Sequence, residues 1–245
     1  MMRDAMREAR GLTPSYVIKR VFMKNTSYEG AVTARLASIH GDIFWDIGAN
    51  VGFYTFQLRK NFRKIIAVEP NPQTAYVLRR RIKFSLARNI EVKQLALSDN
   101  RGWTYLYSNQ RQGLGIDIVA GIGNRSSSDS LLPRFEYRSA RDPSGGSDRV
   151  HRDRRSIPVQ MERFDDVSTG LVDLIKIDVE GAEFRVLEGM RKSLEARLVR
   201  NIVVELHNRD LKPELESVLL GYGYHIRWID LEHLMARFDD EGSEE

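Results

Sequence analysis

One stretch of the sequence, WDIGANVGFYT at residues 45–55, decides how the rest of the chain is interpreted. It extends an apolar run, IFWDI (43–47), which predicts a short buried strand. Gly48 and Gly52 allow the backbone to turn tightly and leave room for a ligand against the main chain. We therefore expect a strand, a glycine-containing turn that binds a ligand, and a helix over residues 53–60.

This turn does not match the glycine pattern of a dinucleotide-binding fold. That pattern would place glycines at positions 48, 50 and 53, whereas this chain has Asn50 and Phe53. A P-loop is also absent from the sequence, because no Gly-Lys-Ser/Thr follows a glycine at the required spacing. A pyrophosphate is therefore not the expected ligand, and a nicotinamide-dependent oxidoreductase ranks last among the alternatives.

Two acidic residues at strand ends indicate a different ligand. Asp46 ends the first strand, where a carboxylate suits a nearby cation such as an ammonium or a sulfonium. Glu69 follows the second predicted strand, KIIAV (64–68), and lies 23 residues after Asp46. A carboxylate at that place can accept both hydroxyls of a ribose. A ribose and a positive amino-acid end together describe S-adenosylmethionine, although Asp46 alone could equally be the N-cap of the next helix.

Predicted strands and helices alternate along most of the chain, which favours an α/β fold with a mostly parallel sheet and helices on both faces. Ligands of such sheets bind at the carboxyl ends of the strands, so residues just beyond strand ends are candidates for chemistry. Beyond the first two strands, we expect strands at 90–97, 171–177 and 201–206, helices at 71–87, 182–196 and 213–220, and an antiparallel pair at 224–229 and 234–238.

The region 101–163 interrupts this alternation, and we interpret it as an insertion on the substrate side. Every second residue from Trp103 to Tyr107 is aromatic, which predicts an added strand, and IPVQMERF (157–164) predicts another. The stretch 141–156 is rich in Gly, Ser, Asp and Arg and is expected to be a loop.

The chain is expected to divide into three parts. Residues 1–42 are expected to form an N-terminal helical extension, which could be a lid or a dimer contact. Residues 43–238 form the main domain with its insertion. Residues 239–245, DDEGSEE, form an acidic tail that we expect to be disordered.

Composition excludes several classes of chemistry. The 245 residues contain no cysteine, so disulfides, thiolate metal sites, iron–sulfur clusters and cysteine nucleophiles are ruled out. No run approaches the roughly 18 apolar residues of a membrane helix. The charged start, MMRDAMREARG, lacks the apolar core of a secretory signal. We therefore expect a cytoplasmic protein without a membrane partner.

Positive charge is concentrated in the insertion. Residues 101–163 contain 11 Arg, no Lys and 7 acidic residues, a local net charge of +4 that equals the net charge of the whole chain. A basic surface suits an anionic substrate or RNA. The plainer alternative is a solvated, arginine-rich loop.

The candidate catalytic residues follow two later strands. Asp178 ends the fourth core strand, and Glu205 and His207 end the fifth, where alternate residues point to the same side. His207 suits a general base, because its ordinary pKa is close to neutrality, and Asp178 or Glu205 could orient it. An alternative is a divalent metal held by the same three residues, but we predict no metal.

Other polar residues have simpler interpretations. Glu183 is expected to be a first-turn acid that interacts with the helix dipole. Arg79, Arg80 and Arg81 are expected to lie on a solvated helix face, and Trp45 in the core.

The sequence resembles the FkbM family of methyltransferases. The resemblance rests on WDIGANVGFYT (45–55), AVEPNP (67–72), ALSD (96–99), LIKIDVEGAEFRVLEGM (174–190) and VVELH (203–207), in the family's order. It implies a Rossmann-like class I methyltransferase fold with a seven-stranded sheet, and S-adenosylmethionine as the methyl donor. It also implies a set of cofactor-binding residues: Asp46, Gly48, Ala49, Asn50, Gly52, Tyr54, Glu69, Pro70, Ser98, Asp99, Asp178 and Glu180.

The resemblance also implies O-methylation of a sugar or another hydroxylated small molecule, which is our leading hypothesis. The second is an RNA methyltransferase that would stack bases on aromatic residues of the insertion. The third is a non-catalytic cofactor-binding protein that has kept the fold. A homodimer is compatible with each of them.

Overall fold

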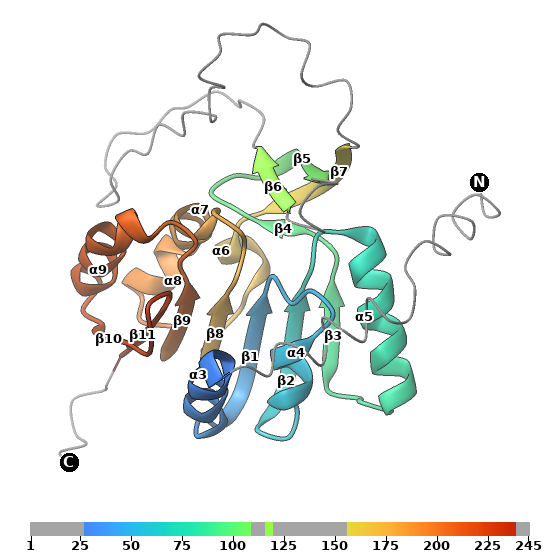
Figure 1. Cartoon of the computed structure of the whole chain (residues 1–245), viewed down its shortest axis with the longest axis horizontal. Helices are drawn as coiled ribbons and strands as arrows, with labels where there is room; N and C mark the ends of the chain where they lie inside the picture. The colour runs from blue at the N-terminus through green and yellow to red at the C-terminus, as the bar shows by residue number, and fades with distance from the viewer. Residues whose placement is uncertain (1–26, 109–115, 120–155, 239–245) are drawn as a thin grey trace, which may run out of the picture.

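The computed structural model describes residues 27–108, 116–119 and 156–238, which form a large and a small β-sheet with helices around the large one (Figure 1). The large sheet has seven strands in the order β10-β11-β9-β8-β1-β2-β3. This is the α/β, Rossmann-like, mostly parallel arrangement that the sequence predicts.

The five parallel strands are β1 (Gly41–Ile47), β2 (Phe62–Val68), β3 (Ile90–Lys93), β8 (Leu174–Ile177) and β9 (Asn201–Glu205). The ends of β1 and β2 and all of β8 are buried and mostly apolar, as expected for strands covered on both faces, with Asp46 and Lys176 as the charged exceptions. The predicted antiparallel pair is confirmed as β10 (His225–Trp228) and β11 (His233–Arg237), with β11 antiparallel to β9.

Helices cover both faces of the large sheet. Alternate residues of each strand point to opposite faces and therefore pack against different helices. Phe44 and Ile65 pack against α3 (Ser27–Ala37) and α4 (Phe53–Gln57), and Ala67 packs near α5 (Pro72–Ser85). Trp45 and Ile66 belong to the core on the other face. The elements on that side are α6 (Phe164–Val167), α7 (Glu183–Gly189), α8 (Arg191–Glu195) and α9 (Lys212–Gly221), with the 3-10 turn η3 (Arg209–Leu211) before α9.

Three predicted elements differ from the structure. The single strand expected at 90–97 is two strands, β3 and β4 (Ala96–Leu97), which belong to different sheets. The helix expected at 182–196 is broken at Met190 into α7 and α8. The first helix ends at Gln57 rather than at residue 60. In each case apolar residues continue past the point where the backbone changes direction, and their spacing alone does not reveal that point.

The insertion builds a second sheet. Its strands are β4, β5 (Gly102–Ser108), β6 (Ile116–Val119) and β7 (Ser156–Glu162), in the order β4-β7-β5-β6. Both added strands are thus confirmed, and the sheet has a small core of its own, which includes Leu106 and Met161. Figure 1 shows this sheet beyond the carboxyl ends of the large sheet's parallel strands. The insertion therefore lies on the side where a ligand of the large sheet would bind.

The expected extension and tail fall largely outside the described residues, as does the loop 141–155. Strand β1 starts at Gly41, two residues before the expected start of the main domain. No helix in the described ranges has both the length and the apolar character needed to span a membrane.

The end of β1 touches the end of β8. The amide N–H of Asp178 donates to the carbonyl of Ile47 at 2.9 Å. A Cβ built on Gly48 would lie 1.7 Å from the carbonyl oxygen of Asp178, and Gly48 has φ +82°. Only glycine tolerates this φ and also leaves room for the Asp178 carbonyl, so any other residue would force β1 and β8 apart.

We expect Gly48→Ala to lower the free energy of unfolding by about 3 kcal/mol or more, because it adds a backbone clash to the left-handed strain. Gly170→Ala is the matched control: φ is +76° there, and nothing lies within 4 Å of an added Cβ. The control should cost only about 1–2 kcal/mol. Urea unfolding of both variants tests this, and equal losses would contradict the close contact.

Candidate active site

The glycine turn after β1 is held against β2. The amides of Gly48 and Ala49 both donate to the carbonyl of Val68 at 2.9 Å. Asn50 has φ 51°, which is uncommon outside glycine, and Gly52 has φ 87°. The turn is therefore a rigid backbone loop at the carboxyl edge of the sheet, as the sequence predicts.

Asp46 is buried beneath this turn, with 2% of its surface exposed. Its Oδ2 accepts hydrogen bonds from the backbone N–H of Thr55, at 2.9 Å, and from the Thr55 hydroxyl. Burial raises the pKa of Asp46 above its ordinary value, although the nearby Lys176 opposes this. The carboxylate thus binds an amide in the first turn of α4, as an N-cap would, and also faces a cation that belongs to the protein.

Glu69 is held by two backbone amides. Its Oε2 accepts from Asn50 N–H at 2.9 Å, and its Oε1 accepts from Asn71 N–H at 2.8 Å. Burial raises the pKa of Glu69 to about 7, against the opposing effect of these hydrogen bonds. Each carboxylate oxygen keeps a further lone pair, so the group can still accept hydroxyl donors. A rigid acceptor beside the glycine turn fits the ribose of S-adenosylmethionine.

The remaining predicted cofactor residues lie around this edge at different depths. The Ser98 hydroxyl donates to Asp99 Oδ1 at 2.9 Å, at the end of β4. Pro70 links Glu69 to Asn71, the N-cap of α5. Tyr54 is buried, with its ring 4.6 Å from Lys176 Nζ. For Tyr54 in particular, a direct cofactor contact stays a prediction.

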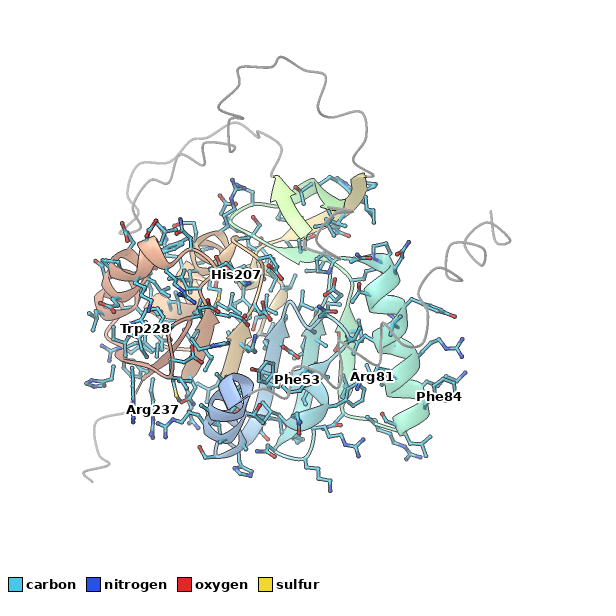
Figure 2. All side chains as sticks on the ribbon, viewed as in Figure 1. Phe53, Arg81, Phe84, His207, Trp228 and Arg237 are labelled. Carbon is cyan, nitrogen blue, oxygen red and sulfur yellow. The ribbon has the colours of Figure 1, made fainter. Side chains whose placement is uncertain are left out.

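Three carboxylates, which follow β8 or begin α7, meet around His207 beyond the end of β9. Its Nδ1 donates to Glu183 Oε1 at 2.7 Å. Its Nε2 lies 3.3 Å from Glu180 Oε2 and 3.8 Å from Asp178 Oδ1. Figure 2 shows His207 at the end of the large sheet that faces the small one. The arrangement is a histidine oriented through one ring nitrogen, with the other directed at two carboxylates.

This environment changes the protonation of His207. Burial alone would lower its pKa, but the Glu183 hydrogen bond and the charges of Glu183, Asp178 and Glu180 outweigh it and raise the pKa to about 9. His207 is therefore protonated at neutral pH in the absence of a bound cation.

The expectation that Asp178 or Glu205 orients His207 is wrong. Glu183 does so: it lies in the first turn of α7, as predicted, accepts a hydrogen bond from Gly181 N–H at 2.9 Å, and is buried. No pattern in the sequence links Glu183 to His207, because the two lie 24 positions apart and are separated by two helices and a strand. Glu205 instead lies 3.4 Å from Lys176 Nζ and 3.3 Å from His233 Nε2.

Lys176 is the residue of this region that the sequence prediction missed. It interrupts the apolar strand LIKI, yet its side chain is only 1% exposed. Its Nζ lies 3.1 Å from Asp178 Oδ2. Burial would lower the pKa of Lys176, but Asp178, Glu205 and Asp46 together raise it, so the residue is charged. A lysine inside an apolar run was the available signal.

Arg81 also departs from its prediction as a solvated residue. It is half-buried, donates to the carbonyl of Val51, and lies over the Phe56 ring at 4.5 Å. Arg81 therefore braces the glycine turn from α5. Trp45 is confirmed as a core residue, 3% exposed.

The structure changes the set of residues that could hold a metal. Among the described residues, ligand atoms of Asp178, Glu180 and His207 lie within 4.8 Å of one another. Glu205, which the sequence alternative included, is held by Lys176 and His233. Glu180 therefore replaces Glu205 in that alternative.

The fold and this edge define the class of the protein. A parallel sheet with an antiparallel strand pair at one edge, a glycine turn after β1 and an acidic residue after β2 describe a class I methyltransferase. The family model for the "Methyltransferase FkbM domain" matches residues 46–226. The chain belongs to the FkbM family and is an S-adenosylmethionine-dependent methyltransferase.

Two curated proteins are similar in sequence. Methyltransferase sdnD of Sordaria araneosa is 30% identical over 197 residues, which cover 74% of this chain and 73% of sdnD. The AMB antimetabolite synthetase AmbE of Pseudomonas aeruginosa is 29% identical over 218 residues. These cover 79% of this chain but only 10% of AmbE, so the likeness concerns a small part of that protein.

A solved structure supports the fold. The crystal structure of methyltransferase FkbM from Methylobacillus flagellatus matches with a TM-score of 0.51 at 15% identity. The match covers 81% of this chain and 44% of that one. The chain thus spans less than half of that protein.

We expect Glu183→Gln to lower the pKa of His207 from about 9 toward its ordinary 6.5, because glutamine keeps an acceptor for Nδ1 but removes the charge. The His207 ion pairs stabilise the fold below pH 6.5, and this contribution is lost as pH rises through about 9. The variant should therefore be less stable than the wild type at pH 6.5 and below, and the difference should shrink as pH rises through about 9.

NMR titration of the five histidines, with His207 assigned by His207→Asn, measures this directly. Glu195→Gln, at a half-exposed acid of α8, is the control that should leave the His207 pKa unchanged. A His207 pKa that stays near 9 in Glu183→Gln would contradict the orienting role.

Proposed function

We propose that this methyltransferase transfers a methyl group to a hydroxyl of a sugar or another small molecule, with His207 as the general base. The observation that carries this proposal is the His207–Glu183 pair, which directs Nε2 of His207 toward Asp178 and Glu180 at the carboxyl edge. A hydroxyl acceptor must lose a proton during the transfer, and an imidazole oriented through its other nitrogen suits that task.

The residues around the glycine turn would hold the methyl donor. Glu69 accepts the ribose hydroxyls, and the turn from Gly48 to Gly52 offers its backbone to the amino-acid end. When bound there, S-adenosylmethionine supplies an electrophilic methyl group on a sulfonium. Burial of Asp46 and Lys176 below the turn keeps this floor rigid, which positions the reactants and excludes water.

His207 must be neutral before it can accept a proton. Its pKa of about 9 in the ligand-free protein means that the neutral form grows as pH rises. A cation bound nearby disfavours the imidazolium and therefore lowers this pKa. We assign Asp178 and Glu180 to contact the acceptor or the donor, and Glu205 to a positioning role through Lys176.

We expect micromolar binding of S-adenosylmethionine and S-adenosylhomocysteine, weakened about tenfold or more by Glu69→Asp, because the shorter side chain cannot keep its two amides and reach the ribose. Glu91→Asp is the matched control, since Glu91 is exposed on the neighbouring β3 and pairs with Lys64 and Lys93. Calorimetric titration of the folded variants decides. Equal affinities in both variants would remove Glu69 from the cofactor site.

We expect His207→Asn to reduce kcat for the acceptor by about 10²–10⁴-fold while donor affinity changes little, as for loss of a general base. His225→Asn, at an exposed histidine of β10, is the control. The wild-type rate should rise with pH and level off at or below about pH 9. A pH-independent rate, or an activity abolished by metal chelation and restored by Mg²⁺, would favour the metal alternative.

The acceptor is sought among sugars, hydroxylated metabolites and RNA, by release of S-adenosylhomocysteine. RNA is the second candidate, supported by Trp103, which is 68% exposed on β5 and free to stack on a base. Methylation of RNA alone would replace the small-molecule proposal. The cytoplasmic location, the homodimer and the absence of a membrane partner stay predictions.

A further inference from the structure

A row of buried charges with alternating sign crosses the large sheet below the candidate active site. Asp46 of β1 lies beside Lys176 of β8 in the sheet register. Glu205 of β9 follows, and it pairs in register with His233 of β11. Asp230, in the turn before β11, completes the row.

Four members of this row form a chain of ion pairs, and Asp46 acts on Lys176 through its charge. Lys176 Nζ lies 3.4 Å from Glu205 Oε2, and Glu205 Oε2 lies 3.3 Å from His233 Nε2. His233 Nδ1 lies 3.0 Å from Asp230 Oδ2. Lys176 and His233 are almost completely buried, and Asp46 is 2% exposed. We call these five residues the charge row.

Lys176 is the point at which the row meets the active site. Its Nζ lies 3.1 Å from Asp178 Oδ2, and its ammonium faces the buried Tyr54 ring. Asp46, Asp178 and Glu205 all act on this one ammonium. Because water is excluded, the lysine charge is weakly screened and acts on whatever binds above it.

The two cofactor forms differ mainly in one charge. S-adenosylmethionine carries a positive sulfonium, whereas S-adenosylhomocysteine has a neutral sulfur, lacks the transferred methyl and is otherwise identical. The ratio of their affinities therefore reports the electrostatic potential at the sulfur. Carboxylates raise the preference for the sulfonium form, and a buried cation lowers it.

We propose that Lys176 is a positioning residue that fixes Asp178 and limits the preference of the site for the charged methyl donor over its neutral product. This inference rests on the proposed donor site. The physical reason is that the transfer removes the positive charge from sulfur. Strong attraction of the sulfonium to carboxylates therefore stabilises the bound donor more than the transition state, and it does not speed the transfer. Glu205 holds Lys176 in place from the side away from Asp46, and His233 in turn holds Glu205.

The test compares Lys176→Met, Glu205→Gln and the double variant with the wild type by calorimetric titration of both ligands. Lys176→Met removes the cation with a side chain of similar length, and we expect it to raise the preference for S-adenosylmethionine about tenfold. Glu205→Gln removes a negative charge and should lower that preference. The double variant removes one charge of each sign and should return to within about threefold of the wild type.

The double variant and Glu205→Gln keep the test decisive if Lys176→Met alone does not fold, because they leave fewer unpaired buried carboxylates. A purely structural role of Lys176 would weaken both ligands equally and leave their ratio unchanged. Unchanged ratios in folded variants that bind both ligands would overturn this inference alone. Failure of the wild type to bind either ligand would overturn the proposed donor site and this inference with it.

Discussion

At the end of β1, the backbone of Gly48 lies against the carbonyl oxygen of Asp178 at the end of β8, with no room for a side chain. This contact sets the distance between the two strands that carry the chemistry. It places the glycine turn, which follows β1, next to Asp178 and Glu180, which follow β8. Everything that follows at the carboxyl edge depends on this close approach of two backbones.

The second constraint is the cost of buried charge. Asp46, Glu69 and Glu183 are nearly inaccessible, and each is compensated differently: by a helix amide, by two loop amides and by a histidine. Unpaired carboxylates at such depth would be strongly unfavourable. The compensating groups therefore fix the backbone of the turn, the start of α5 and the His207 ring at the same time.

The insertion contributes in a different way. Strand β4 continues directly from the third core strand of the sequence but pairs with β7 of the small sheet rather than with the large sheet. This places Ser98 and Asp99 between β4 and β5 of the small sheet, next to the region expected to select the acceptor.

Several features were determined by the sequence alone, because each depends on neighbours along the chain. The alternation of apolar strands and helices predicted the sheet, and Asp46, Gly48, Gly52 and Glu69 predicted a donor site at its edge. These are local signals: a strand end, a turn that requires glycine, and an acidic residue just past a strand.

Only the tertiary structure decided which charged groups meet. Glu183 orients His207 across 24 residues, Lys176 joins Asp178 to Glu205, and Arg81 supports the glycine turn from a helix that looked solvated. Side-chain pairing between distant strands depends on register and packing, which no local pattern encodes. The sequence therefore predicted the edge of the sheet at which the site lies, and the packing of β8, β9 and α7 determined which charged residues meet there.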